Sequence, residues 1–313
     1  MSLFLNLASQ GLINGAVYAL IAIGLAMVFG LLRILHIAHA GLFALGGYLG
    51  LVVTNATGSF ALGLAVSMAV VAACGVLMYR LCYEPILEQP PYVPLIASVG
   101  MFLAIEELLR LVFGDHGLSY HVPPLAGAID LGGMRIKYAE IAVVVMACVL
   151  LGGLALFATR TRIGMAWRAT VSEPRMAASC GVSLRQVRHL NFAIGSAFAA
   201  AAGVMVGVLN NLVEPSMGAV PSYKALAIIV LGGLGNMGGT LVAALLLGLV
   251  EAFGATYLSN YLDRDSIAFA AMLCVLLVRP EGLFSGTKGS TGLLARKLQL
   301  KGAAKWVLTK RPS

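Results

Sequence analysis

The chain has 313 residues, of which 60% are hydrophobic and only 11% are charged. A chain this apolar cannot cover a water-facing surface of ordinary polarity, which excludes a soluble globular protein. We therefore expect an all-α integral membrane protein, a polytopic bundle of about eight to nine membrane segments that includes short or broken helices.

Stretches free of Asp, Glu, Lys and Arg locate the predicted membrane segments. Each can supply the roughly 20 apolar residues that a helix needs to cross the hydrocarbon of a bilayer. The stretch 34–79 is long enough for two crossings, and Thr54 to Ser59 supply a turn in its middle, so we expect a helical hairpin there. The charge-free stretches are 3–32, 34–79, 141–159, 189–213 and 225–250.

Polar side chains in the first two stretches are candidates for a solute path. Asn14 and Tyr18 lie four residues apart on one helix face, where they can hydrogen-bond a solute or bridge to another helix, and bridging is the favoured interpretation. His36 and His39 lie three apart with no third ligand nearby, which favours a polar lining or a helix end over a metal site. The five cysteines are scattered without a CxxC pair, so we predict no metal site from them either.

Three carboxylates fall within or beside predicted membrane helices. Glu106 and Arg110 stand four residues apart and are expected to form a local ion pair. Glu107 has no equally good local partner and Glu251 has none, so both are candidates for a proton relay. An interfacial position or pairing across helices is the favoured interpretation of both.

The distribution of basic residues predicts the orientation. The segment between 159 and 188 holds six arginines against one acid, and the chain after residue 284 holds seven basic residues and no acid. Such an excess marks the cytoplasmic side of a membrane protein. The net charge of +8 is thus mainly a topology signal with affinity for anionic membrane lipid, and nucleic-acid binding is disfavoured because aromatic residues are not interleaved with the basic ones.

A glycine-rich segment interrupts the second half of the chain. Two cytoplasmic ends require an even number of crossings between Arg188 and Arg279, so the short stretch 223–236 must supply the fourth one. It ends in Gly232 to Gly239, and backbone this poor in side chains is tolerated at membrane depth only where protein or water satisfies it. We therefore expect a broken helix beside a solute path. Gly233 to Gly238 fit GxGxxG, but without the strand and acid of a dinucleotide site a membrane turn is favoured.

The arginine-rich segment also predicts a short exposed helix. Ser172 is expected to cap a helix that runs from Glu173 to Cys180, and Gly181 is expected to end it. A short amphipathic helix against a membrane suits a groove on a partner protein.

Sequence motifs occur in order at 12–25, 162–169, 172–182, 192–203, 232–236 and 279–284. They resemble the motifs of one family, the permeases of high-affinity branched-chain amino acid ABC transporters. The resemblance covers nearly the whole chain, and the order and spacing of its motifs make it specific. One departure is that the family's Asn-Phe-Ala-His-Gly-Glu stands here as His36 to Gly41, which keeps the second histidine and lacks the acid.

The resemblance implies a permease domain over 1–286, with a cytoplasmic coupling loop at 159–188 and a basic cytoplasmic tail at 287–313. It implies a bacterial inner-membrane subunit that pairs with a second related permease, two cytoplasmic ATPases and a periplasmic binding protein, to import branched-chain or related amino acids, with urea and other small amides also served by relatives. The expected ATPase-contact residues are Ser172, Glu173, Arg175, Ala177, Ala178 and Gly181. The expected solute-path residues are Asn14, Tyr18, His39, Gly233, Gly235 and Asn236.

The same resemblance implies no catalysis and no cofactor on this chain. A GxxxxGK[ST] phosphate loop is absent from the sequence, so ATP and magnesium would be bound by the partner ATPase. The alternative is a stand-alone proton-coupled transporter of a small polar solute that uses Glu107 or Glu251. An intramembrane enzyme ranks last, since no nucleophile and base stand at a suitable spacing.

Overall fold

The computed structural model describes residues 2–131, 134–258, 263–279 and 282–283. The predicted tail at 287–313 lies outside these residues. The elements along the described chain are α1 (Ser2–Leu32), α2 (His39–Thr57), α3 (Phe60–Met78), η1 (Tyr79–Tyr83), η2 (Glu84–Ile86), α4 (Tyr92–Phe113), β1 (Ala128–Leu131), β2 (Met134–Lys137), α5 (Tyr138–Arg160), α6 (Arg162–Ser172), α7 (Pro174–Ser179), α8 (Leu184–Asn210), α9 (Ala219–Gly232), α10 (Met237–Tyr257) and α11 (Arg264–Val278).

The predicted helical membrane bundle is confirmed. Six helices of the described chain are long and apolar enough to cross a bilayer: α1, α2, α3 with its continuation to Ile86, α5, α8 and α10. Helices α9 and α11 are apolar but shorter, as expected for broken or short segments. The structure departs from an all-α fold in one place, because β1 and β2 form an antiparallel hairpin before α5.

The hairpin predicted within 34–79 is confirmed as α2 and α3. Gly58 ends α2 in the left-handed conformation, with a φ of 70°, which a residue without a Cβ adopts without strain. The Ser59 side chain then caps α3 by accepting a hydrogen bond from the Leu62 amide at 3.5 Å. After Met78 the α-helix continues directly as the π-helix η1, which we did not predict from the sequence.

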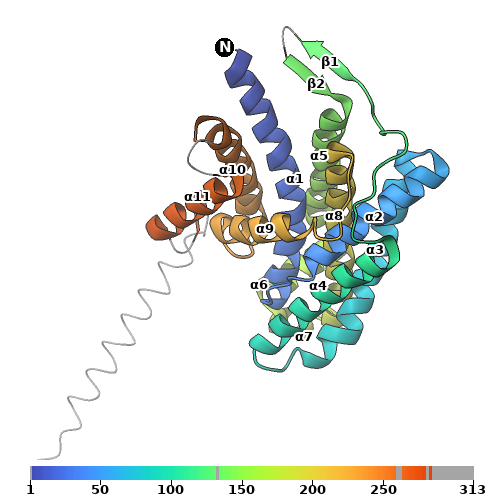
Figure 1. Ribbon diagram of the computed structural model, residues 1–313. Coiled ribbons are helices and arrows are strands. Elements are labelled where there is room, and N and C mark those ends of the chain that lie inside the picture. The colour runs from blue at the N-terminus through green and yellow to red at the C-terminus, as the bar shows by residue number, and fades with distance from the viewer. Residues whose placement is uncertain (1, 132–133, 259–262, 280–281, 284–313) are drawn as a thin grey trace, which may run out of the picture.

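The bundle has two distinct ends. Figure 1 shows the N-terminus and the β1–β2 hairpin at one end, called the hairpin end, and α6 and α7 at the other, called the α7 end. At the hairpin end the His121 amide donates to Asn55 Oδ1 at 3.1 Å, which ties the loop before the hairpin to the α2–α3 turn. At the α7 end, Arg185 of α8 pairs with Glu84 of η2 at 2.7 Å. The loop before the hairpin thus lies against the α2–α3 turn at one end, and η2 lies against the start of α8 at the other.

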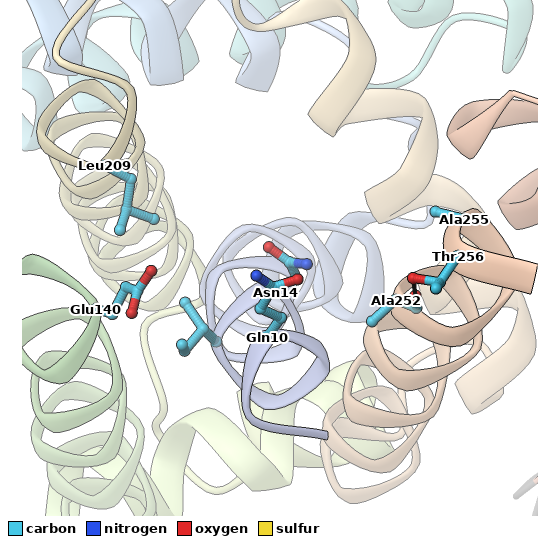
Figure 2. A pocket seen from close by; sticks show the side chains of 8 residues that line it. Gln10, Asn14, Glu140, Leu209, Ala252, Ala255 and Thr256 are labelled. Carbon is cyan, nitrogen blue, oxygen red and sulfur yellow. Dashed lines mark hydrogen bonds between the residues drawn. The ribbon is translucent and has the colours of Figure 1, made fainter. Parts of the chain in front are cut away.

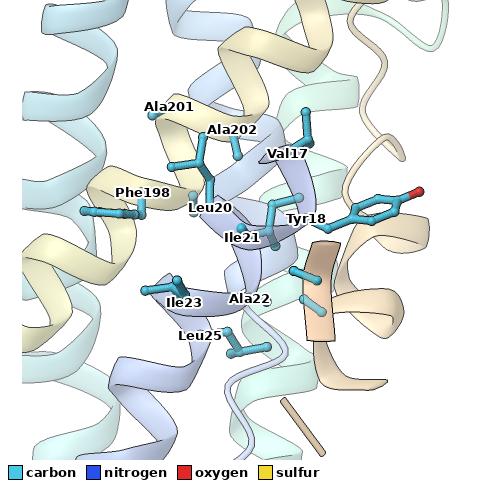
Figure 3. Close-up of a cluster of buried hydrophobic side chains, with 14 of the residues drawn as sticks. Val17, Tyr18, Leu20, Ile21, Ala22, Ile23, Leu25, Phe198, Ala201 and Ala202 are labelled. Atoms are coloured by element: carbon cyan, nitrogen blue, oxygen red, sulfur yellow. The ribbon is translucent and has the colours of Figure 1, made fainter. Parts of the chain in front are cut away.

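Helix α1 runs through the centre of the bundle. Its middle, Leu20 to Ile23, is buried and packs against Phe198, Ala201 and Ala202 of α8 (Figure 3). Small residues let the backbones approach closely: a Cβ on Gly15 would lie 2.9 Å from the Cα of Leu245 in α10, and one on Gly24 would lie 2.8 Å from the carbonyl oxygen of Gly195 in α8. Such close contact is how membrane helices gain packing energy without a hydrophobic driving force.

The outer helices present apolar side chains to the surroundings. Leu77 of α3, Leu111 of α4 and Val149 of α5 are 55%, 84% and 63% exposed. A soluble protein does not spread large aliphatic residues over several neighbouring helices in this way. These surfaces fit the acyl chains of a bilayer.

Candidate functional site

A polar pocket opens at the hairpin end beside α1. It has a volume of about 280 Å³. Gln10 and Asn14 of α1 stand in its centre, with Glu140 and Leu209 on one side and Ala252, Ala255 and Thr256 of α10 on the other (Figure 2). The predicted solute-path residue Asn14 thus lines a pocket. We call this the outer pocket.

One turn further along α1, a buried ion cluster joins four helices. The hydroxyl of Tyr18 donates to Glu251 of α10 at 2.7 Å. Lys224 of α9 contacts Glu251 at 2.9 Å and Asp265 of α11 at 2.8 Å, and its ammonium donates to the Tyr18 oxygen at 3.1 Å. Lys224 and Glu251 are 4% and 0% exposed at their side chains. A charge in such a place is retained only when it is paired and hydrogen-bonded.

The structure gives partners to both carboxylates for which the sequence offered no good local one. The favoured interpretation of Glu251, pairing across helices, is confirmed, since it pairs with Lys224. Glu107 was expected to lack a good local partner, but Arg110 contacts both Glu107 and Glu106 at 2.8 Å. The predicted pair of Glu106 and Arg110 is confirmed. Neither Glu107 nor Glu251 is therefore a lone carboxylate of the kind a proton relay would use.

The largest cavity described opens at the α7 end. It has a volume of about 740 Å³ and lies between the end of α1, helix α6 and the glycine-rich turn that joins α9 to α10. The predicted solute-path residues Gly233, Gly235 and Asn236 all line it. Two cations, Arg33 and Arg168, lie on its wall. We call this the inner cavity.

The glycine-rich turn is a helix end followed by a helix start. Gly233 and Gly235 have φ values of 92° and 86°, which allow the chain to reverse between α9 and α10. The side chain of Asn236 caps α10 by accepting from the Gly239 amide at 3.1 Å. The Leu283 amide donates to the Leu231 carbonyl at 2.7 Å, which joins a second predicted family motif to this turn. A helix precedes the GxGxxG pattern, so it has none of the strand context of a dinucleotide site.

His36 and His39 lie in the packed interior at a break between helices. Residues 33–38 are not helical, and His39 starts α2. His36 Nδ1 lies 2.7 Å from the Tyr83 hydroxyl, and His39 Nε2 lies 3.2 Å from the Ile21 carbonyl oxygen. The helix-end interpretation is thus confirmed, whereas the role of His39 in a solute path remains a prediction. Within the described residues, no three His, Cys, Asp or Glu side chains come close enough together to hold a metal ion.

The predicted short helix of the coupling loop is confirmed as α7, with one correction. Ser172 does not cap it, because α6 extends through Ser172 and Glu173 lies between the two helices. Gly181 ends α7 with a φ of 84°, and the Val182 amide donates to the Ala177 carbonyl at 3.1 Å. The other predicted ATPase-contact residues, Glu173, Arg175 and Ala178, are exposed, while Ala177 is buried. The adjacent Met176 is 70% exposed, which leaves an apolar side chain on the helix surface.

A hydrogen-bonded chain connects this exposed segment to α1. Trp167 of α6 is 5% exposed, and its indole Nε1 donates to the side-chain oxygen of Asn191 in α8 at 2.9 Å. The amide nitrogen of Asn191 donates in turn to the carbonyl oxygen of Met27 in α1 at 3.0 Å. Trp167 and Met27 also line the inner cavity. Asn191 therefore bridges α6 and α1.

The outer pocket and the inner cavity do not meet. Along α1 they are separated by Leu20 to Leu25, a run of side chains that is almost fully buried. Tyr18 and the ion cluster lie at the hairpin-end side of this packed segment. The chain thus has an opening at each end of α1 and a closely packed segment between them.

Sequence reasoning missed Lys224, Asp265, Trp167 and the outer-pocket residues Gln10 and Glu140. One signal for Lys224 was present, since it is a lone cation at the start of the short apolar stretch 223–236. Asp265 and Trp167 carry no local signal, because their partners Lys224 and Asn191 lie on other helices. Their roles depend on which helices become neighbours.

Comparison with known proteins gives one family. The family model described as branched-chain amino acid transport system / permease component matches residues 7–277. The chain is 31% identical over 295 residues to the high-affinity branched-chain amino acid transport system permease protein BraD of Pseudomonas aeruginosa, covering 90% of this chain and 95% of BraD. It is 29% identical to LivH of Escherichia coli over 90% of this chain and 95% of LivH, and 25% identical to LivM of the same organism over 87% and 68%. No solved structure matches the chain.

Proposed function

The chain belongs to the family of branched-chain amino acid transport permeases, and we propose that it is a permease subunit of an ATP-driven importer of branched-chain or related amino acids. One observation carries this proposal beyond the family match. The exposed helix α7 is joined through α6, Trp167 and Asn191 to α1, beside the largest cavity described. A partner bound to α7 would thus be connected, through α6 and these hydrogen bonds, to the middle of α1.

The mechanism that fits this geometry is a mechanical one. Closure of the partner ATPases would push on α7 and α6, and the Trp167–Asn191–Met27 hydrogen bonds would pass the displacement to α1. Because α1 also borders the outer pocket, its movement would open one end of the path while the other end closes. The chain itself carries out no covalent step.

We propose eight to nine membrane segments with the α7 end in the cytoplasm of a bacterial cell, at the inner membrane. The arginine excess in 159–188 supports this orientation, as does the basic composition of the C-terminal tail. Besides the six long apolar helices, α4, α9 and α11 would supply the remaining segments. Helix α4 carries Glu106, Glu107 and Arg110, which neutralise one another in part.

The proposed assembly contains a second permease chain, two cytoplasmic ATPases and a periplasmic binding protein, in contact with membrane lipid. LivH and LivM, both permease proteins of the branched-chain system of E. coli, match this chain, which supports a pair of related permeases. ATP and magnesium would be bound by the ATPases. A stand-alone proton-coupled transporter is not favoured, since the two carboxylates proposed for it are both ion-paired.

The test is co-purification of the assembly from membranes in mild detergent. We expect the wild-type chain to bring an ATPase with it, and Glu173→Ala with Arg175→Ala to lose most of that ATPase, because both side chains are exposed at the start of α7. The matched control is Asp130→Ala with Arg135→Ala, which removes an acid and an arginine that face each other across the β-hairpin at the opposite end.

The control should keep its ATPase and its leucine-stimulated ATP hydrolysis in nanodiscs. If the wild-type chain brings no ATPase, or if chain alone accumulates leucine under a proton gradient, the proposed function is wrong. If both double variants lose the ATPase equally, the function stands but α7 is not the contact.

A further inference from the structure

The outer pocket carries a single charge. Among the described residues that line it, Glu140 is the only one with an ionised side chain. Its Oε2 accepts a hydrogen bond from the Lys137 amide at 3.0 Å, as part of the capping box that starts α5. This bond holds the carboxylate in place and leaves its other oxygen, Oε1, for a ligand. The pocket therefore favours a ligand group of positive charge.

Two amide side chains of α1 line the same pocket. Gln10 and Asn14 stand about one turn apart, and Figure 2 shows both amides in the centre of the pocket, with Glu140 beside them on the α5 side. Within the part of the chain that the structure describes, no hydrogen bond engages either amide. Each amide nitrogen can donate two hydrogen bonds. The pair can therefore hold the oxygens of a ligand carboxylate without a cation.

Most of the remaining lining is apolar. It consists of Ile13, Leu209, Ala252 and Ala255, together with Thr256, and Figure 2 shows Leu209 next to Glu140. An aliphatic side chain of a ligand would gain roughly 25 cal/mol for each Å² of apolar surface it covers here. The volume of about 280 Å³ lies just below the range of roughly 300–1,000 Å³ typical of small-molecule sites, which limits the pocket to a small ligand.

We propose that the outer pocket binds a zwitterionic α-amino acid with an aliphatic side chain, whose ammonium pairs with Glu140. The ligand carboxylate accepts hydrogen bonds from Gln10 and Asn14, and the ligand side chain lies against Ile13 and Leu209. This inference rests on the proposed function and deepens it, because it assigns each part of the solute to named residues of one pocket. It also disfavours urea and other uncharged amides as solutes, since they cannot form an ion pair with Glu140.

The single charge of the pocket predicts an order of affinity among analogues of leucine. Leucine supplies an ammonium for Glu140 and a carboxylate for the two amides. Leucinamide keeps the ammonium but replaces the carboxylate by a neutral acceptor, which forms weaker hydrogen bonds. 4-Methylpentanoate lacks the ammonium, so it leaves Glu140 without a counter-ion and brings a second negative charge close to it. Affinity should therefore fall from leucine to leucinamide to 4-methylpentanoate.

The experiment measures how well these three compounds protect a cysteine in the outer pocket. The full permease–ATPase complex, with its native cysteines replaced by serine, is reconstituted in nanodiscs with Ala255→Cys. The rate of modification by a water-soluble maleimide is followed without nucleotide, after leucine import has been checked. Thr256→Cys, on the same wall, is the second reporter in case Ala255→Cys disturbs the fold. Leu125→Cys, on the exposed loop before the β-hairpin, is the control outside the pocket.

Leucine should slow the modification of the pocket cysteine about tenfold at a concentration that fills about nine-tenths of the sites, and should not protect Leu125→Cys. The concentration that gives half-maximal protection should be about tenfold higher for leucinamide than for leucine, because a charged hydrogen-bond acceptor is lost. For 4-methylpentanoate it should be at least about 100-fold higher, because the ion pair with Glu140 is lost and repulsion is added.

Glu140→Gln should change the order of the ligands while keeping the fold, since a glutamine oxygen can still accept the hydrogen bond from the Lys137 amide. The half-protecting concentration of leucine should rise at least about tenfold, whereas that of 4-methylpentanoate should fall because the repulsion is removed. Glu107→Gln, which removes an exposed carboxylate of α4, is the matched control and should leave all three concentrations unchanged.

Three results would overturn the inference. Equal protection by the three compounds, or an unchanged order in Glu140→Gln, would show that Glu140 does not pair with the ligand. No modification of either pocket cysteine without ligand would show that a protein surface covers the pocket. Unchanged reactivity with leucine in a complex that imports leucine would place the amino acid elsewhere while the proposed function stands. Failure of the proposed function itself would appear differently, as the absence of both ATPase binding and leucine import.

Discussion

Two clusters of charged side chains in this protein are built in opposite ways. On α4, Arg110 pairs with Glu106 and Glu107, three and four residues away on the same helix. In the ion cluster, Lys224 pairs with Glu251 and Asp265, each of which lies on a different helix. Each cluster is centred on one cation, and Arg110 also lies 3.6 Å from a third carboxylate, that of Asp115 just after α4. The cation is 38% exposed in the first and 4% exposed in the second.

The difference shows which of the charged groups stabilise the packing of the helices against one another. The α4 cluster is made within one helix and would exist in that helix alone, so it adds little to the tertiary fold. The ion cluster exists only when α1, α9, α10 and α11 are assembled, and its burial makes each partner dependent on the others. The predictions below test this contrast, from the largest expected effect to the smallest.

The largest effect is expected for Lys224→Met. It would leave Glu251 buried without its cation, a change that typically costs about 3–5 kcal/mol of folding stability. The thermal midpoint of the purified complex in detergent should fall sharply, with loss of the monodisperse species in size-exclusion chromatography. Replacing Glu251 by Met in the same chain should restore much of the loss, because it removes the uncompensated charge. A Lys224→Met protein as stable as wild type would mean that Glu251 needs no partner.

A smaller effect is expected for Tyr18→Phe. The change removes the hydroxyl that donates to Glu251 at 2.7 Å, while Lys224 still neutralises that carboxylate. The cost should be about 1 kcal/mol, the usual contribution of one hydrogen bond. Tyr92→Phe on α4, where the ring is 62% exposed, is the control and should leave the thermal midpoint unchanged. Equal thermal midpoints for the Tyr18→Phe and Tyr92→Phe variants would show that the Tyr18 hydroxyl does not stabilise the cluster.

The smallest effect is expected for Arg110→Gln. An exposed ion pair typically contributes about 0–1 kcal/mol, so the thermal midpoint should change little. Whatever difference remains should shrink as salt is raised, since exposed charges are screened. A loss as large as that of Lys224→Met would show that the α4 cluster, too, supports the assembled bundle and that the contrast between the clusters is wrong.

The same contrast explains how much of the structure the sequence could predict. Features that depend on neighbours along the chain were accessible: the α2–α3 turn at Gly58 and Ser59, the end of α7 at Gly181, and the Glu106–Arg110 pair. The apolar stretches likewise located the long helices, because their length is set by the thickness of the bilayer.

Features that depend on neighbours in space were not accessible. Glu251 received no partner from the sequence because Lys224 lies 27 residues away and Asp265 comes from a third helix. The exposed α7 could be predicted, but its link through Trp167 and Asn191 to Met27 could not, since it spans three helices. The Ser172 cap failed for a nearer reason: Ser172 is the last residue of α6, so Glu173 takes the position before α7.

The close contact of α1 with α8 and α10 has a mechanical consequence. At Gly15 and Gly24 backbone lies directly against the neighbouring helix, so no flexible side chain is available there to yield under load. Helix α1 has 31 residues, which at 1.5 Å per residue is about 46 Å of rigid rod. A displacement of α1 near Met27 would therefore also move α8 and α10, because the contacts at Gly24 and Gly15 leave no gap between the helices to absorb it.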